Sequence, residues 1–429
     1  MLTSASLMLL FELGYLFLGV QARAIESRNS IPTTEHVFPL MRRSVAPGSK
    51  ISQLPGIANL TRVGGGVSFS TKVSLGQETY DMIVDTGSSD TWVASKTLQC
   101  TYFGIEVSQA FCKFGPLYDR QTFKKIQGQN FRIQYGDGTE ATGDMGYDSV
   151  TLGGINVPSQ EIAVVERAFW QGDSVTSGLL GFSYPSITSA YNGTDPSKDQ
   201  HRKNQLPYDP LLTTMYKQGS INPVFSLAIN RGANNEPAGV LALGGIPSEF
   251  QSLTYARTPI ARTNFLNEDE PSAAIPSKYE FYALYPEAFL YGPPSSKNTS
   301  TMPDPTTLTN DTRRLIHIVD SGTTLNILPQ PLAANIAAAY TPPAISPSGG
   351  IYVVNCRATP PIFGVQIGGQ VFYVNPTDMI MQQGGTCYAT VANGGMEAPF
   401  ILGDPFFKST VVVFDLERNE VRVGGREFY

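Results

Sequence analysis

Residues 82–89 read Met-Ile-Val-Asp-Thr-Gly-Ser-Ser, and residues 317–324 read His-Ile-Val-Asp-Ser-Gly-Thr-Thr. In each copy an apolar run typical of a buried strand leads into an aspartate, a small hydroxyl residue, a glycine and two more hydroxyl residues. Each copy is followed later by an apolar-apolar-glycine triplet, at 179–181 in the first half and at 401–403 in the second. The repeated order predicts a duplicated structure whose two turns face each other about a pseudo-two-fold axis.

The two turns carry Asp85 and Asp320, which we predict to be catalytic. Two carboxylates in contact cannot both ionise cheaply, so they hold one shared proton across a range of acid pH. The ionised member can take a proton from a bound water while the protonated member donates to a carbonyl oxygen. This general acid and base pair hydrolyses an amide with no metal and no covalent intermediate. One such turn alone is weak evidence, because most Asp-Ser-Gly sequences are only turns.

The residues after each aspartate have expected roles that follow from their chemistry. The glycines let the two loops approach closely without a side-chain clash. The hydroxyl residues before them are expected to bond across to the opposite loop, and those after them to donate to the outer carboxylate oxygens. In chain order these residues are Thr86, Gly87 and Ser88 in the first copy, and Ser321, Gly322 and Thr323 in the second.

Further motifs accompany the two turns. Residues 90–93 read Asp-Thr-Trp-Val, residues 135–138 read Tyr-Gly-Asp-Gly, residues 178–185 read Gly-Leu-Leu-Gly-Phe-Ser-Tyr-Pro, and residues 401–406 read Ile-Leu-Gly-Asp-Pro-Phe. With these motifs, residues 66–429 resemble the pepsin-like aspartic peptidases, most closely the secreted fungal branch. The resemblance implies a mainly β, bilobal fold of the double β-barrel or sheet type, with pseudo-two-fold symmetry and a flap hairpin over a central cleft.

A strand-like run at 131–135 followed by turn residues at 136–138 predicts a hairpin from the residues alone. The resemblance implies that this hairpin is the flap, which closes over an extended peptide and excludes water. Trp92 matches the tryptophan that bonds to the flap tyrosine in the family, although a plain core aromatic fits Trp92 as well. The expected substrate-binding residues are Gly87, Tyr135, Gly136, Asp137, Gly322, Thr323 and Thr324.

Some features leave alternatives open. Asp404 matches an acidic position near the dyad in several family members, and it is either a modulator of the dyad's pKa values or a turn residue. The second turn has Ser321 where the first has Thr86, a change that keeps the hydroxyl group. The loop between Cys100 and Cys112 is longer than in gastric pepsins. Subsite preference, natural substrate and pH optimum stay open.

The N-terminus predicts a secretory leader. An apolar run at 7–20 is too short to span a membrane, and Ala-Arg-Ala at 22–24 fits a cleavage site, so we predict a signal peptide at 1–24. Residues 25–60 are rich in Pro, Ser and Arg and carry the dibasic pair Arg42-Arg43. They predict a basic pro-segment that pairs with an acidic body until low pH weakens the pairing, with a plain disordered tail as the alternative.

The rest of the chain is predicted to form two lobes, at 61–247 and 248–429, each with one catalytic aspartate. Its strand-like runs recur between turns, and the best helical stretches lie at 210–218 and 331–339. Polar stretches at 191–209 and 291–312 are expected to be exposed insertions outside the cores.

Four cysteines are spaced as two local pairs, which predicts the disulfides Cys100–Cys112 and Cys356–Cys387. The cysteines form no C-x-x-C pair and there are 3 histidines in the whole chain, so we expect no metal and no cofactor. The disulfides agree with secretion, with an acidic vacuole as the alternative destination. Sequons that a glycosylating compartment could modify are present at Asn59, Asn192, Asn298 and Asn310.

The chain is therefore predicted to be a secreted aspartic endopeptidase, a zymogen-derived and glycosylated hydrolase that cuts polypeptides at acid pH. We expect it to be a monomer that binds extended peptides and pepstatin-type inhibitors. The net charge of −6 and the lack of long Lys/Arg runs argue against nucleic acid, and we expect no membrane anchor. The alternative is a bilobal scaffold that binds or inhibits another protein without cutting it, although such relatives usually lose a catalytic aspartate, a neighbouring glycine or the flap tyrosine.

Overall fold

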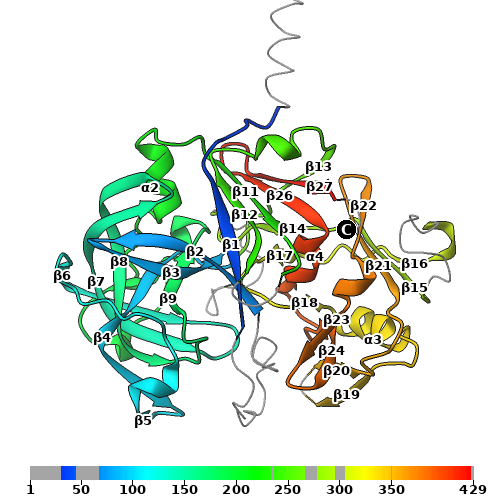
Figure 1. Cartoon of the computed structure of the whole chain (residues 1–429), viewed down its shortest axis with the longest axis horizontal. Helices are drawn as coiled ribbons and strands as arrows, with labels where there is room; N and C mark the ends of the chain where they lie inside the picture. The colour runs from blue at the N-terminus through cyan, green and yellow to red at the C-terminus, as the bar shows by residue number, and fades with distance from the viewer. Residues whose placement is uncertain are drawn as a thin grey trace, which may run out of the picture.

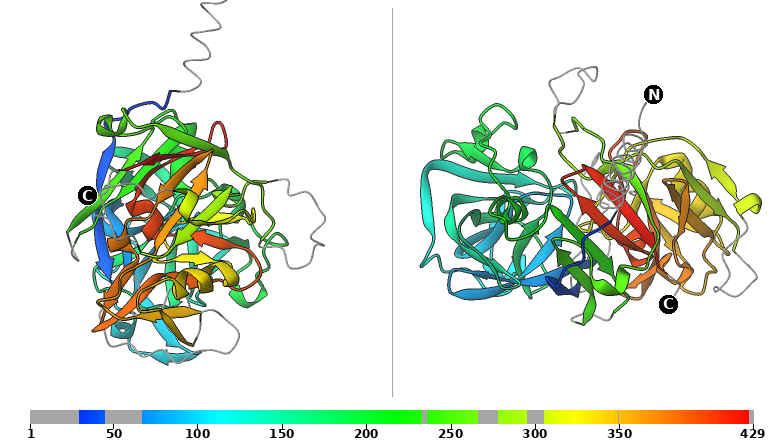
Figure 2. Two further views of the ribbon diagram at one scale, coloured as in Figure 1. Left: turned by 90° about the vertical axis from the view of Figure 1, so that its right-hand side faces the viewer. Right: turned by 90° about the horizontal axis from the view of Figure 1, so that it is seen from above.

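The computed structural model describes residues 30–44, 67–232, 236–265, 278–294, 305–348 and 350–426. It is built mainly of strands, as predicted, and has two halves on either side of a central group of strands (Figures 1 and 2). The predicted signal peptide at 1–24 and the two sequons at Asn59 and Asn298 lie outside the described residues.

The largest sheet has 15 strands and runs through the N-terminal half into the middle of the molecule. Its central part combines strands from both ends of the chain, because β11 pairs with both β12 and β26. The strands are β1 (Val37–Ser44), β2 (Val67–Leu75), β3 (Glu78–Asp85), β4 (Thr91–Tyr102), β5 (Ile105–Val107), β6 (Lys124–Gln134), β7 (Glu140–Leu152), β8 (Ile155–Phe169), β9 (Thr176–Gly181), β10 (Ala190–Asn192), β11 (Val224–Ile229), β12 (Pro237–Leu243), β13 (Tyr255–Pro259), β26 (Thr410–Asp415) and β27 (Glu420–Gly425).

The C-terminal half holds a sheet of eight strands and a sheet of four. The first contains β14 (Ala283–Leu284), β17 (His317–Val319), β18 (Asn326–Leu328), β19 (Ile345–Ser348), β20 (Ile351–Val354), β23 (Ile380–Gln383), β24 (Thr386–Asn393) and β25 (Phe400–Leu402). The second contains β15 (Ala288–Gly292), β16 (Thr309–Asp311), β21 (Ile362–Ile367) and β22 (Gln370–Tyr373). Three α-helices are described, α2 (Leu211–Lys217), α3 (Gln330–Ala338) and α4 (Asp404–Lys408), and the first two fall on the stretches predicted as helical.

The duplicated sequence corresponds to a duplicated strand arrangement. Strand β3 ends at Asp85 and runs parallel to β9, with Asp85 opposite Gly181. Strand β17 ends one residue before Asp320 and runs parallel to β25, with Val319 opposite Leu402. Each apolar-apolar-glycine triplet therefore lies beside the strand that delivers an aspartate. Strand β17 is buried throughout, and β3 is buried at Val84 and Asp85, where it reaches the turn.

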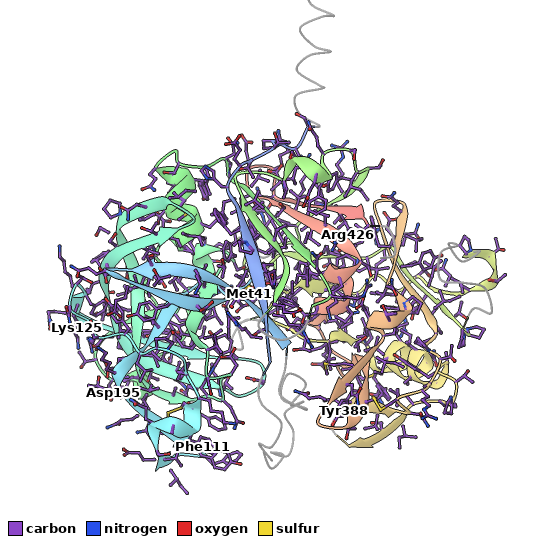
Figure 3. The ribbon with its side chains drawn as sticks, in the orientation of Figure 1. Met41, Phe111, Lys125, Asp195, Tyr388 and Arg426 are labelled. Atoms are coloured by element: carbon purple, nitrogen blue, oxygen red, sulfur yellow. A yellow bond between two sulfur atoms is a disulfide. The ribbon has the colours of Figure 1, made fainter. Side chains whose placement is uncertain are left out.

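Strand β1 lies inside the stretch predicted as a pro-segment and takes part in the central sheet. It pairs antiparallel with β2 on one side and with β12 on the other, and Leu40 is completely buried. Figure 3 shows Met41 of this strand between the two halves of the molecule. This strand is thus neither fully exposed nor devoid of regular structure: residues 37–41 are all apolar, and Leu40 and Arg43 are buried.

The two polar insertions also contain more structure than expected. Strand β10 lies in the first, where Tyr191 and Asp199 are buried, and β16 lies in the second and pairs with β15. The predicted disulfides, Cys100–Cys112 and Cys356–Cys387, are confirmed. Among the described residues, no helix combines the length and apolar character needed to cross a membrane.

Candidate functional site

The two aspartate turns meet at the centre of the molecule. A methyl group built on the Gly87 Cα would stand 2.6 Å from the Asp320 Cγ, and one on the Gly322 Cα would stand 2.5 Å from the Asp85 Oδ1. Each carboxyl group therefore fills the space beside the other turn's glycine. Asp85 and Asp320 are 5% and 9% exposed, so both groups are buried but still reach solvent.

Each aspartate accepts the same pair of hydrogen bonds from its own turn. The inner oxygens accept from the backbone amides of Gly87, at 2.8 Å, and Gly322, at 2.7 Å. The outer oxygen of Asp320 accepts from the Thr323 hydroxyl at 2.6 Å, and that of Asp85 accepts from the Ser88 hydroxyl. These donors fix both carboxyl groups in orientation, so their remaining lone pairs are directed toward each other and the space between the turns.

The hydroxyl groups of Thr86 and Ser321 connect the two turns reciprocally. The Thr86 hydroxyl accepts from the Ser321 amide at 3.0 Å and donates to the Val319 carbonyl at 3.0 Å. The Ser321 hydroxyl accepts from the Thr86 amide at 3.2 Å and donates to the Val84 carbonyl at 3.0 Å. Four hydrogen bonds, two in each direction, thus lock loops that are 235 residues apart in sequence.

Burial and the neighbouring Asp320 carboxyl raise the pKa of Asp85 well above its usual range. The Ser88 and Gly87 donors act in the opposite direction, because they favour the ionised oxygen. The net direction means that the pair keeps a proton at acid pH. An acid and a base therefore lie side by side in one buried site, as needed for concerted proton transfer.

The predicted flap is a hairpin formed by β6 and β7, with residues 135–139 between the strands. The Tyr135 carbonyl accepts from the Gly138 amide at 2.9 Å, and the Asp137 carboxylate accepts from the Thr139 amide at 2.9 Å and from its hydroxyl at 2.6 Å. A methyl group on the Gly136 Cα would meet nothing within 4 Å, so the turn has open space on that side.

The Tyr135 side chain turns back toward the dyad. Its hydroxyl accepts a hydrogen bond of 2.8 Å from the Trp92 indole nitrogen, and Trp92 is completely buried. Trp170 packs edge-on against both rings, with centroids 5.2 Å from Trp92 and 5.7 Å from Tyr135. The structure therefore brings together Trp92 and Tyr135 and adds Trp170, which sequence reasoning missed.

Two further buried acids lie near the dyad. The Asp90 Oδ1 accepts from the Ser189 amide at 2.9 Å and from the Tyr208 hydroxyl at 2.7 Å, while Asp90 Oδ2 has no hydrogen-bond partner. Asp404 is 1% exposed and both its carboxyl oxygens have no hydrogen-bond partner. Burial raises the pKa of Asp90 to about 6 and that of Asp404 well above its usual range, with the Asp320 charge adding to the latter.

The remaining predicted residue, Thr324, follows Thr323 directly and is 8% exposed. Among the described residues, no group of three or more His, Cys, Asp or Glu side chains is arranged to hold a metal ion. The described site thus consists of a carboxyl pair, its hydrogen-bond donors and an aromatic flap contact.

The known proteins that this chain resembles in sequence and in fold are aspartic proteases. The model of the family "Eukaryotic aspartyl protease" matches residues 68–279 and 297–425. A probable aspartic-type endopeptidase of Aspergillus fumigatus is 39% identical over 86% of this chain and 80% of its own length. Rhizopuspepsin-2 of Rhizopus niveus is 29% identical over 92% of this chain and 88% of its own. The solved aspartic proteinase from Irpex lacteus has the same fold, with a TM-score of 0.61, 18% identity, and coverage of 91% of this chain and 97% of that one.

Proposed function

Because the chain belongs to the eukaryotic aspartyl protease family and is an aspartic-type endopeptidase, we propose that it is secreted and hydrolyses peptide bonds at acid pH through a water held between Asp85 and Asp320. The observation that carries this proposal is the mutual contact of each carboxyl group with the other turn's glycine.

In this mechanism the ionised carboxylate takes a proton from the water as the water attacks the peptide carbonyl carbon. The protonated carboxyl group donates to the carbonyl oxygen, giving a tetrahedral gem-diol without a covalent bond to the enzyme. The newly protonated carboxyl group then transfers its proton to the leaving nitrogen as the C–N bond breaks. A gem-diol hydroxyl gives its proton to the other carboxylate, so the pair again holds one proton. The reaction needs one carboxyl proton, so activity falls once both groups ionise.

Substrate is proposed to bind extended between the flap and the two turns. The backbone groups of Gly136 and Asp137 at the tip, and those of Gly87 and Gly322 on the floor, supply hydrogen bonds that are independent of side-chain identity. Thr323 and Thr324 continue the floor in the second half. The Trp92–Tyr135 bond supports the flap in a position above the dyad.

A direct test compares the wild-type enzyme with Asp85→Asn and Asp320→Asn on acid-denatured haemoglobin at several pH values. Each variant is expected to lose at least about a thousandfold in kcat, since either change removes the acid and base pair. The wild type is expected to bind immobilised pepstatin at acid pH. Full activity in either variant, maximal cleavage above pH 8 or indifference to pepstatin would contradict the proposal, and absence of cleavage with intact pepstatin binding would leave only the binding role.

We also propose that residues 25–60 are a removable pro-segment. On β1 the Arg43 guanidinium donates to the Ser70 hydroxyl and to the Asp81 carboxylate, each at 2.8 Å, and is 6% exposed. Burial lowers the pKa of the Arg42 guanidinium, and the charge of the buried Asp404 acts in the opposite direction. Protonation of carboxylates at low pH removes the attraction that holds such a basic strand.

N-terminal sequencing and intact mass of the secreted enzyme test this maturation proposal. The mature chain is expected to lack residues 25–60, and retention of residues 25–43 would end the pro-segment idea. The same mass spectrum reports glycans at Asn192 and Asn310. Both residues lie in short strands and are exposed. Gel filtration is expected to show a monomer.

A further inference from the structure

An ion pair connects the polar insertion at residues 191–209, in the N-terminal half, to the C-terminal half. The Arg202 guanidinium pairs with the Glu280 carboxylate and also donates to the Asn264 side-chain oxygen. The Arg202 side chain is 34% exposed, whereas that of Glu280 is 0% exposed. The second Glu280 oxygen accepts from the Thr263 hydroxyl at 2.8 Å and the Phe265 amide at 3.2 Å, so the carboxylate is fully engaged.

On the N-terminal side, Arg202 is attached to the strand that carries the flap. Strand β10 of the same insertion pairs with β6, where Ala190 lies opposite Phe131. The Asn130 side chain of β6 donates to the Gly193 carbonyl at 3.2 Å and to the Asp199 carboxylate at 3.3 Å. Strand β6 ends at Gln134, next to the flap tyrosine. Arg202 thus belongs to an insertion that is paired with, and hydrogen-bonded to, the first strand of the flap hairpin.

On the C-terminal side, Glu280 begins the segment that supports both aspartate turns. The Glu280 carbonyl accepts from the Ser183 hydroxyl at 2.8 Å, and the Tyr282 hydroxyl donates to the Phe182 carbonyl at 2.5 Å. The Phe182 amide in turn donates to the Asp85 carbonyl at 2.9 Å. The Tyr282 carbonyl accepts from the Val319 amide at 3.0 Å, directly before the second aspartate.

Resting on the proposed function, we propose that Arg202 is a positioning residue for catalysis. Its ion pair with Glu280 sets the place of segment 280–284 relative to the flap strand, and through that segment it sets the separation of Asp85 and Asp320. A general acid and base pair depends on sub-ångström placement, so a small shift of this segment lowers the rate of the chemical step.

The charge and the geometry of the pair favour positioning over a contribution to stability alone. A buried carboxylate with a partly exposed arginine partner costs desolvation free energy that its Coulomb attraction only partly offsets. Such a pair does fix the orientation of its side chains, because the planar guanidinium donates to Glu280 and Asn264 at the same time. Arg202 adopts a left-handed backbone conformation with φ of 63°, which is costly for a residue of this size and fixes where its side chain starts.

The test measures kcat per active site in Arg202→Gln, with sites counted by pepstatin titration at a temperature where every variant is folded. We expect kcat per site to fall about tenfold while KM changes less than twofold, because Arg202 acts through Glu280 and does not contact substrate. Arg202→Lys keeps the charge and is expected to recover at least half of the wild-type kcat.

Arg313→Gln is the matched control, since it breaks an exposed arginine–carboxylate pair with Asp311 within the C-terminal half. It is expected to leave kcat per site unchanged. A merely structural role for Arg202 would reduce the number of titratable sites but leave kcat per site within twofold of wild type, and that result overturns the inference. If Arg202→Gln gives too few sites to titrate, kcat per site is measured in Glu280→Gln instead. A fall of about tenfold supports the inference, and a value within twofold of wild type overturns it. Failure of the wild type to cleave or to bind pepstatin would instead refute the proposed function.

Discussion

Gly322 lies against Asp85, so that a methyl group on the Gly322 Cα would stand 2.5 Å from the Asp85 Oδ1 oxygen. The Gly322→Ala variant must therefore push the two turns apart or displace the carboxyl group. We expect kcat to fall at least about a hundredfold, because the acid and the base no longer share a proton at the same distance. Steady-state kinetics with thermal unfolding as a check on the fold would measure this.

The control for that variant is Gly425→Ala. There a methyl group would meet only the Phe372 ring at 3.6 Å, which is ordinary van der Waals contact. Activity within twofold of wild type is expected for it. Equal losses in the two variants would mean that the close approach at Gly322 is not what limits catalysis.

Because Asp90 is buried, we expect the free energy of unfolding to decrease as pH rises toward neutrality. Burial raises the pKa of Asp90 to about 6, so its contribution to stability is complete below its unfolded pKa and is lost as pH rises through about 6. At neutral pH this corresponds to about 3 kcal/mol. Asp90→Asn keeps an acceptor for Ser189 and Tyr208, so we expect a higher Tm than wild type at pH 7 and little difference at pH 3.5.

Asp119→Asn provides a control of opposite sign. Hydrogen bonds from the Gln121 amide and from Lys96 lower the pKa of the partly exposed Asp119, so its smaller contribution to stability is present above the ordinary pKa and lost as pH falls. That variant is expected to lower Tm slightly at pH 7. If Asp90→Asn is less stable than wild type at pH 7, ionisation of Asp90 does not destabilise the folded protein and the prediction is wrong.

Intrinsic fluorescence should report on the flap, because the chain has 2 tryptophans and both Trp92 and Trp170 contact Tyr135. We expect pepstatin to change the emission in a saturable way, with a midpoint equal to its inhibition constant. Tyr135→Phe leaves the Trp92 indole N–H unpaired in a buried place, which costs about 1–3 kcal/mol and should lower kcat/KM. An emission spectrum that pepstatin leaves unchanged would argue against flap movement at these residues.

The Arg43–Asp81 pair makes a prediction for β1. Arg43→Gln removes a buried charge from the pair, so we expect the N-terminal segment to be released or cleaved at a higher pH than in wild type. Mass spectrometry after stepwise acidification measures this pH. Lys72→Gln is the control, because Lys72 pairs with the same carboxylate at 3.2 Å but its side chain is 72% exposed.

The sequence was informative where local pattern and chemistry coincide. The apolar run before Asp85 and the one before Asp320 predicted buried strands, and β3 and β17 lie there. The disulfide pairing followed from spacing. Strand β1 was not foreseen as part of a sheet, because its partner β12 is remote in sequence and its own stretch is rich in Arg and Pro.

The Arg202–Glu280 pair was beyond prediction for a similar physical reason. Arg202 stands in a polar stretch whose composition is typical of an exposed loop, and Glu280 gives no local signal of complete burial. Only the folded arrangement brings together these residues, which are 78 positions apart, and buries the Glu280 carboxylate beneath a partly exposed Arg202. The same holds for Asp90 and Tyr208, which are 118 positions apart.

The pairing of β1 with β12 has a consequence for how the protein is made. Val37 lies opposite Ala242, so the first described strand emerges from the ribosome long before its partner exists. Strand β17, which leads into Asp320, pairs with β25, and β25 is made only at residues 400–402. During synthesis the nascent chain therefore cannot assemble its dyad until translation is almost finished, and prematurely terminated products are expected to be proteolytically inert.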